Sequence, residues 1–317
     1  MSQITVIVTF YNQAAWVGCA LDSVLAQTHP DVQLIITDDA STDDTSIAIS
    51  QWLVDHRHDL ADRSMAHQVV TAASNIGLPA ILNKALAQAT GAAIAILNGD
   101  DWMAPDRIQR QHNALDSAPC AVGLVYSDIR LHSADGRPTG QVLPLPGTLT
   151  LNGQVLRRLI TEESLIGMSM IMFRRSMLSE IGEFDTSLMA DDFDFILRVA
   201  AANYEFRYIP GVVTNVRRYS SSMTGGDNLG ALFQGQIVAL RKLLGPDQTL
   251  NDVVYRRLEN LAITLHGLDG HSREARIALW HVLRGRPSKR AARGLAECLL
   301  RLPARSLAPR RRVPNSV

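Results

Sequence analysis

Residues 4–12 read Ile-Thr-Val-Ile-Val-Thr-Phe-Tyr-Asn, an apolar, β-branched run that ends in polar and aromatic side chains. Such a run predicts a buried strand at 4–9, and a helical pattern follows at 14–27. The alternation of strand and helix patterns continues at residues 32–37, 41–55, 67–71, 79–88 and 92–97. We therefore expect an α/β fold with a mostly parallel sheet that is flanked by helices on both faces.

Polar clusters directly follow three of these strands. They are Thr9 to Asn12, Asp38-Asp39 and Asn98-Gly99-Asp100-Asp101. In open α/β sheets, ligands bind outside the carboxyl ends of the strands. The sequence therefore predicts one ligand site that draws on all three clusters.

The Asp100-Asp101 pair places two carboxylates side by side, which repel each other unless a cation or hydrogen bonds are present. Mg²⁺ and Mn²⁺ accept carboxylate oxygens and complete their shell with phosphate oxygens. Such an ion would neutralise the charge on a departing diphosphate, and Gly99 would let the backbone approach a ligand closely. The alternative is a solvated turn in which an aspartate caps the next helix.

Two further acidic clusters are candidates for binding and catalysis. A carboxylate such as Asp39 only accepts hydrogen bonds, so it suits the imide N–H of uracil or thymine, or a ribose hydroxyl. In Asp191-Asp192-Phe193-Asp194, which opens a helical pattern, neighbouring acids can raise the pKa of one member and make it a general base. Helix capping is the alternative at both places.

The pattern changes to almost continuous helix from residue 229 to residue 302, so we place a domain boundary near residue 225. Residues 1–224 would form the α/β domain, and residues 225–317 a helical region with a basic tail. The segment 132–153 is rich in Gly, Pro and Thr, and we expect an irregular excursion or arm there.

The net charge of zero conceals an asymmetry. Residues 1–224 carry 15 Lys/Arg against 24 Asp/Glu (net −9), whereas residues 225–317 carry 16 against 7 (net +9). Residues 289–302 can form a basic amphipathic helix suited to anionic lipid, so we expect a peripheral membrane contact through the tail and no nucleic-acid partner. A solvated helix is the alternative.

The three cysteines are widely spaced, which predicts reduced thiols in a cytoplasmic protein. The sequence contains no stretch of about 18 uncharged apolar residues, so we expect no transmembrane helix. Together with the basic tail, these features predict a cytoplasmic protein that lies peripherally at the inner face of the membrane.

The chain resembles glycosyltransferase family 2, a group of inverting enzymes with the GT-A fold, over about residues 4–224. The resemblance rests on ordered motifs, at Val6–Asn12, Leu21–Thr28, Thr37–Thr45, Asn75–Leu78 with Asn83 and Gly91, Leu97–Asp101 with Pro105, Phe173–Arg175, Gly182–Asp185 and Asp191–Asp194 with Leu197-Arg198.

This resemblance implies an enzyme that moves a sugar from a nucleotide diphosphate, with UDP-sugars favoured, to a hydroxyl of a glycan or lipid-linked acceptor in bacterial glycan biosynthesis. The chain lacks a Gln-x-x-Arg-Trp element, so a non-processive enzyme is implied. The implied roles are nucleoside binding for Thr9, Tyr11 and Asp39, a ribose or diphosphate contact for Asp100, Mn²⁺ or Mg²⁺ binding for Asp101, and general base for Asp192.

Three positions depart from the family pattern. Asn98 stands where a carboxylate is common, Leu82 where many members have Arg, and Tyr219 where many have His. These departures leave a non-catalytic nucleotide- or glycan-binding module as an alternative. A sugar nucleotidyltransferase is a second alternative, although residues 9–15 contain no glycine for a phosphate loop.

Overall fold

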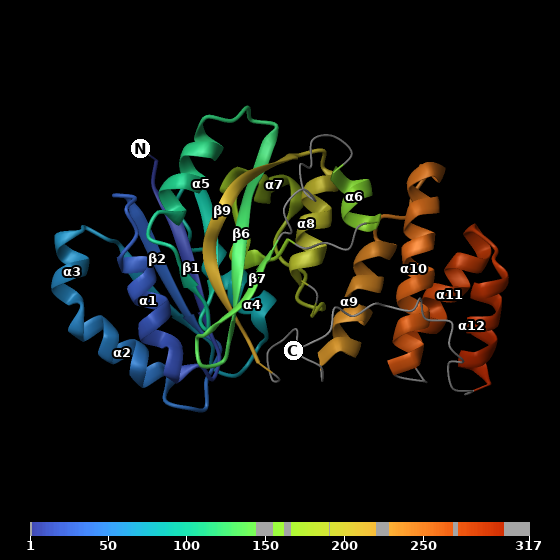
Figure 1. The fold of residues 1–317 in the computed structure, drawn as a ribbon, viewed down its shortest axis with the longest axis horizontal. Coiled ribbons are helices and arrows are strands. Elements are labelled where there is room, and N and C mark those ends of the chain that lie inside the picture. Colours follow the sequence, from blue (N-terminus) through green and yellow to red (C-terminus); the bar gives the residue numbers. More distant parts are fainter. Residues whose placement is uncertain are drawn as a thin grey trace. The chain divides into compact units, whose positions relative to one another are not determined.

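The computed structural model describes residues 2–143, 155–161, 166–189, 191–219, 228–268 and 272–300. The chain forms two compact units, shown in Figure 1. Unit 1 comprises residues 1–155, 164–187 and 195–219, and unit 2 comprises residues 156–163, 188–194 and 220–317.

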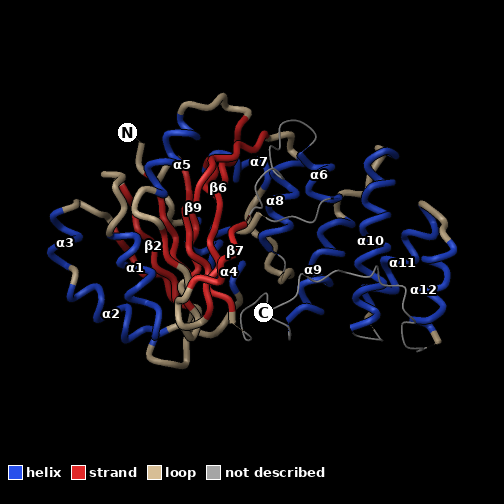
Figure 2. The backbone as a smooth tube through the Cα atoms, in the orientation of Figure 1, coloured by secondary structure: helices blue, strands red, loops and turns tan. Residues whose placement is uncertain are grey.

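Unit 1 is built on a sheet whose order, within the described residues, is β3-β2-β1-β4-β8-β6-β9-β5, with β7 paired to β6 (Figure 2). Its first four strands are parallel. They are β1 Ile4–Phe10, β2 Val32–Asp38, β3 His67–Thr71 and β4 Ala93–Asn98. All seven residues of β1 and of β2 are buried, as expected of strands covered on both faces.

Beyond β4 the sheet becomes mixed, because β8 is antiparallel to both β4 and β6. The remaining strands are β5 Trp102–Met103, β6 Val122–Ser133, β7 Pro138–Leu143, β8 Ile171–Arg174 and β9 Glu205–Arg218. Part of the expected irregular arm is therefore regular, because residues 138–143 form a hairpin with β6. The rest of that arm, residues 144–153, lies outside the described residues.

Helices cover the sheet, which confirms the predicted α/β class. They are α1 Val17–Leu25, α2 Thr45–Asp55, α3 Arg57–Asp62, α4 Leu78–Leu86, α5 Arg107–Asp116, α6 Val155–Thr161, α7 Leu178–Ile181 and α8 Asp191–Ala201, with 3-10 turns η1 Ala14–Trp16, η2 Met168–Met170 and η3 Arg175–Met177. The segments that form α6 and α8 contribute to both units.

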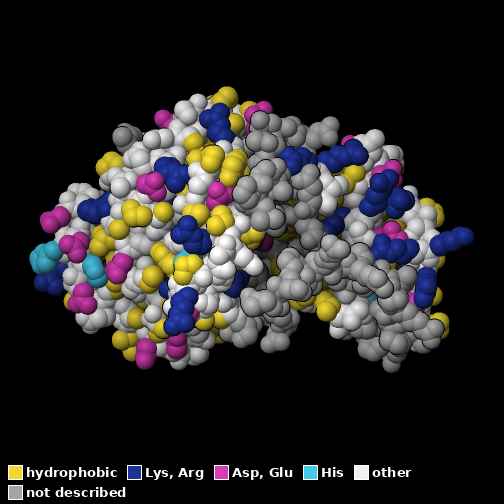
Figure 3. All heavy atoms as spheres, in the orientation of Figure 1, with side chains coloured by type: hydrophobic (Ala, Val, Ile, Leu, Met, Phe, Trp, Pro, Cys, Tyr) yellow, Lys and Arg dark blue, Asp and Glu magenta, His cyan; other side chains and the backbone are white. Residues whose placement is uncertain are grey.

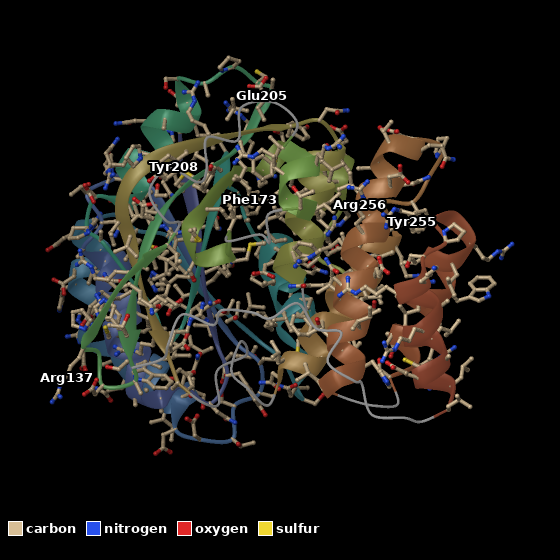
Figure 4. The ribbon with its side chains drawn as sticks, turned by 45° about the vertical axis from the view of Figure 1, so that its right-hand side comes forward. Arg137, Phe173, Glu205, Tyr208, Tyr255 and Arg256 are labelled. Atoms are coloured by element: carbon tan, nitrogen blue, oxygen red, sulfur yellow. The ribbon has the colours of Figure 1, made fainter. Side chains whose placement is uncertain are left out.

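Unit 2 contains the helices α9 Leu229–Arg241, α10 Gln248–Leu268, α11 Arg273–Gly285 and α12 Lys289–Leu299. A Cβ atom on Gly285 would lie 2.1 Å from the Tyr255 ring, so this ring packs directly on the backbone of α11. Tyr255 lies on α10 in Figure 4. Among the residues that the structure describes, none of the helices combines the length and the hydropathy that a membrane span requires.

Candidate functional site

The three predicted polar clusters lie at one edge of the sheet. In the strand register, Thr9 on β1 is paired with Thr37 on β2 and with Asn98 on β4. Past the strand ends, Asp39 N–H donates to the Phe10 carbonyl at 3.1 Å, and Gly99 N–H donates to the Thr9 carbonyl at 2.8 Å. The parallel order of β2-β1-β4 therefore brings Thr9, Asp39 and the Asp100-Asp101 pair to the same edge.

The loop after β1 is fixed by the loop after β2. Asn12 adopts a left-handed backbone (φ 53°), and its Oδ1 accepts a hydrogen bond from Thr42 N–H at 2.8 Å. Its own N–H donates to Ser41 Oγ at 2.9 Å. These bonds order the segment that presents Tyr11, whose ring is exposed, beside buried Thr9.

Asp39 is buried, and both of its carboxylate oxygens are engaged. They accept hydrogen bonds from Ile76 N–H at 2.9 Å and from Gly77 N–H at 2.7 Å. Gly77 has φ +89°, a conformation that favours glycine. Asp39 thus fixes the turn before α4, a role that the sequence did not reveal, and each oxygen keeps one lone pair for a ligand.

Asp101 is 2% exposed and is held from two sides. Its Oδ1 accepts from Arg217 N–H at 3.0 Å, and its Oδ2 accepts from Ser169 Oγ at 2.9 Å. Burial and then the charge of Asp100 raise the pKa of Asp101 to about 7. The carboxylate is therefore held in place by neutral donors, which compensate its charge only in part.

A buried cation lies deeper in the same polar network. Arg107 is fully buried and donates to the carbonyls of Ile96 and Ile171 and to Thr214 Oγ1. Thr214 donates in turn to the carbonyl of Ser169, whose hydroxyl bonds Asp101. Burial lowers the pKa of Arg107 to about 9, and the charge of Asp101 opposes that shift.

Asp100, which is half-buried, has a different partner. The Tyr219 hydroxyl donates to its Oδ2 at 2.8 Å, and the Tyr219 ring lies 5.1 Å from the ring of Trp16. Burial, followed by the charge of Asp100, raises the pKa of Tyr219, so its hydroxyl is protonated at neutral pH. The sequence singled out Tyr219 only as a departure from a family pattern and gave no signal of this contact.

Arg217 packs among aromatic rings. Its guanidinium carbon lies 4.6 Å from the Trp102 ring centroid and 5.8 Å from that of Trp16. Trp102 therefore has a packing role here. The remaining departure from the family pattern, Leu82, is a core residue of α4.

The glycine before the acidic pair serves the protein's own packing. A Cβ atom on Gly99 would lie 2.1 Å from the Phe10 ring. The ring of Phe10 thus requires a glycine at this position, and a close approach of the Gly99 backbone to a ligand stays a prediction.

Asp192 lies in unit 2, at the first turn of α8. It is half-buried, and its Oδ1 accepts a hydrogen bond from Phe193 N–H at 2.7 Å. Two residues later, Asp194 is buried and forms an ion pair of 2.7 Å with Lys242, the residue that follows α9. This ion pair holds α8 in place close to Asp192, the predicted general base. No sequence pattern indicated the ion pair.

The donor set at the sheet edge suits a hard divalent cation. Within the described residues, no group of three or more His, Cys, Asp or Glu side chains is placed to hold a metal ion. Asp100 and Asp101 offer carboxylate oxygens, which Mg²⁺ and Mn²⁺ accept when phosphate and water supply the other ligands. The residues present therefore fit an ion that binds together with a diphosphate.

Sequence comparisons identify the family. The model of glycosyl transferase family 2 matches residues 5–182, more than half of the chain, and that of glycosyl transferase family group 2 matches residues 156–241. A Bacillus subtilis protein named as the teichuronic acid biosynthesis glycosyltransferase TuaG is 28% identical over 179 residues. That match covers 56% of this chain and 64% of the relative, so it spans less than two thirds of that protein.

Solved structures share the fold. The Staphylococcus aureus TarS fragment 1–349, in complex with UDP-GlcNAc, has a TM-score of 0.66 and 17% identity, covering 94% of this chain and 89% of that one. The mannosyltransferase PcManGT of Pyrobaculum calidifontis, in complex with GDP-Man and Mn²⁺, has a TM-score of 0.61 and 22% identity, covering 94% and 80%. With its GT-A fold and its sequence match over residues 5–182, the chain belongs to glycosyl transferase family 2.

Proposed function

We propose that this protein is a glycosyltransferase that moves a sugar, with inversion, from a UDP-sugar to a hydroxyl of a glycan or lipid-linked acceptor. The observation that carries the proposal is the common sheet edge at which Thr9, Asp39 and the Asp100-Asp101 pair meet. In open α/β sheets this edge is where nucleotides bind.

The nucleoside would lie over the ends of β1 and β2. Thr9 and Tyr11 would line its pocket, and Asp39 would accept a hydrogen bond from the base or the ribose through its remaining lone pairs. An imide N–H of uracil is a suitable donor to a carboxylate, which favours UDP. The bound nucleotides of the two structural relatives, UDP-GlcNAc and GDP-Man, support a nucleotide-sugar donor.

Asp101 would hold Mn²⁺ or Mg²⁺, and Asp100 would contact the ribose or the diphosphate. The buried Asp101 carboxylate has neutral partners at both oxygens: Oδ2 accepts from Ser169 Oγ and, at 3.5 Å, from Asn98 Nδ2, and Oδ1 accepts from Arg217 N–H. Oδ1 therefore keeps a lone pair for an ion. When bound, the ion would stabilise negative charge on the leaving diphosphate. The Mn²⁺ in the PcManGT complex supports a divalent ion here.

Asp192 would be the general base. Its carboxylate would take the proton of the acceptor hydroxyl as that oxygen forms a bond to the anomeric carbon of the donor. The bond between that carbon and the diphosphate oxygen breaks on the opposite face of the sugar. Attack from the face opposite the leaving group inverts the configuration.

The nucleotide site can be tested by calorimetry with UDP, in the presence and absence of Mn²⁺. We expect Mn²⁺-dependent UDP binding in the wild type, and Asp101→Asn should weaken that binding at least about tenfold because it removes the charge from the buried metal ligand. Asp59→Asn, on the exposed surface of α3, is the matched control. Metal-dependent binding that survives in Asp101→Asn would refute the role of Asp101.

A further inference from the structure

Two adjacent carboxylates at the sheet edge are each held by a partner of their own. Asp101 has the Ser169 hydroxyl and the Arg217 N–H. Asp100 has the Tyr219 hydroxyl, at 2.8 Å from its Oδ2. Arg217 and Tyr219 both come from the end of β9, so one strand end fixes both acids.

Aromatic packing fixes that strand end independently of the hydroxyl. The Trp16 ring contacts the Tyr219 ring, with centroids 5.1 Å apart, and lies 5.8 Å from the Arg217 guanidinium. Trp102 contacts the same guanidinium at 4.6 Å. The Trp16 ring therefore helps to fix the Tyr219 ring, whose hydroxyl donates to Asp100.

A phenolic O–H donor aimed at a carboxylate does two things. It stabilises the ionised acid through a charge-assisted hydrogen bond, and it limits rotation of the carboxylate. With Tyr219 donating to Oδ2 of Asp100, that oxygen keeps one lone pair for a ligand, whereas Oδ1 offers two. Tyr219 gives its proton to Asp100, so its role toward this carboxylate is that of a donor.

We propose that Tyr219 is a positioning residue of the donor site, which orients Asp100 so that Oδ1 serves the nucleotide diphosphate with its cation while Asp101 coordinates that cation. This inference rests on the proposed function. Tyr219 stands where many family members have His, and we assign it a hydrogen-bonding role toward the Asp100 carboxylate.

The test compares two tyrosine hydroxyls that make the same kind of bond, one on β9 (Tyr208) and one directly after it (Tyr219). Tyr208, labelled on β9 in Figure 4, donates to Asp128 Oδ1 at 2.8 Å, the same distance as for Tyr219 and Asp100. Tyr219→Phe and Tyr208→Phe each remove one hydroxyl and keep the ring. The readouts are the Kd of UDP by calorimetry, with and without Mn²⁺, and the melting temperature.

Tyr219→Phe should weaken Mn²⁺-dependent UDP binding about tenfold, the effect expected from loss of one hydrogen bond to a charged group. Its UDP binding without metal should be unchanged. Tyr208→Phe should bind UDP as the wild type does. A Tyr219→Phe variant that binds UDP and Mn²⁺ with wild-type affinity overturns the inference.

A double-mutant cycle separates positioning from general damage. If Tyr219 acts through Asp100, Tyr219→Phe should add less than twofold to the defect of Asp100→Asn. Full additivity overturns the inference even if the single variant is impaired. Absence of Mn²⁺-dependent UDP binding in the wild type would overturn the proposed function itself, whereas wild-type binding with an unaffected Tyr219→Phe variant overturns only the role of Tyr219.

Discussion

Two histidine rings of unit 1, His29 and His112, are buried against each other, with centroids 4.8 Å apart. Ser2 Oγ is 2.9 Å from His112 Nε2. In the described part of the chain, neither His29 Nε2 nor His112 Nδ1 has a hydrogen-bond partner. Asp31 N–H donates to His29 Nδ1 at 3.3 Å, so the neutral His29 ring carries its proton on Nε2, and a second proton on Nδ1 would displace this bond. A positive His112 would have to bury a proton on Nδ1 without an acceptor, so we expect both rings to be neutral.

Burial is the largest cause that lowers the pKa of each ring. The unfolded chain takes up these protons near pH 6.5, whereas the folded chain does so only at lower pH. The stability that the neutral pair provides is therefore complete above about pH 6.5 and declines as the pH falls below it.

We expect the melting temperature to drop between pH 7.5 and pH 5, and to drop less in His112→Gln. His58→Gln, which changes an exposed histidine, should keep the wild-type pH dependence. An equal drop in His112→Gln and the wild type would remove this pair as the cause. The readout is thermal unfolding followed by circular dichroism at both pH values.

At the scale of elements, the strands that form the ligand edge were predictable because they are apolar runs bounded by turn residues. β9 was not predicted because Pro210-Gly211 interrupts it. Its register against β6 shifts at that point, between Ile209 and Val212, and Gly211 has φ +108°. The N–H of Gly211 donates to the side-chain Oδ2 of Asp128 on β6 instead of to a backbone carbonyl of that strand. A local pattern cannot signal that a strand resumes after such a bulge.

In the candidate site, too, only some of the residues could be predicted from the sequence. Thr9, Asp39 and Asp100-Asp101 were found from their places at strand ends. Arg107, Ser169 and Trp16 were not, because their roles come from contacts between residues distant in sequence. Arg107, for example, is the first residue of α5, yet it is the buried cation of the network that holds Asp101.

The ion pair between Asp194 and Lys242 links α8 to the end of α9 within unit 2. Lys242→Met removes the lysine from a carboxylate that is 1% exposed, so we expect a loss of about 3 kcal/mol in the stability of this unit. If α8 positions Asp192 as the base, the variant should also lower kcat while the Kd of UDP stays the same. Denaturant unfolding and a transfer assay give the two readouts.

Two further variants serve as references for the effects of Lys242→Met on catalysis and on stability. Asp192→Asn should abolish transfer and leave donor binding intact, because it removes the base alone. Asp194→Asn combined with Lys242→Met should recover part of the lost stability, because the buried negative charge that Lys242 balances is removed as well. A Lys242→Met variant with wild-type kcat would show that this ion pair stabilises the fold without serving catalysis.

At the scale of the whole molecule, charge is distributed unevenly along the chain. Residues 225–317 carry the excess of basic residues, and Lys and Arg side chains lie over α10 to α12 in Figure 3. α12 does not offer lipid its whole surface, because Ala291, Gly294 and Cys298 are buried within the protein. Removing this helix would therefore damage the fold. A membrane contact of the tail is better tested by changing charges in the full chain.

We propose that the basic residues after α12 bind anionic lipid, and we expect the full chain to float with anionic vesicles and not with zwitterionic ones. Each basic residue near such a surface contributes about 1 kcal/mol. Arg310→Glu, Arg311→Glu and Arg312→Glu together should therefore weaken binding about a hundredfold or more. The matched control, Arg57→Glu, Arg130→Glu and Arg137→Glu, makes the same change in net charge at exposed positions of unit 1. The two variants differ only in where the charge is reversed. Equal flotation of both would therefore mean that vesicle binding depends on net charge and not on the tail.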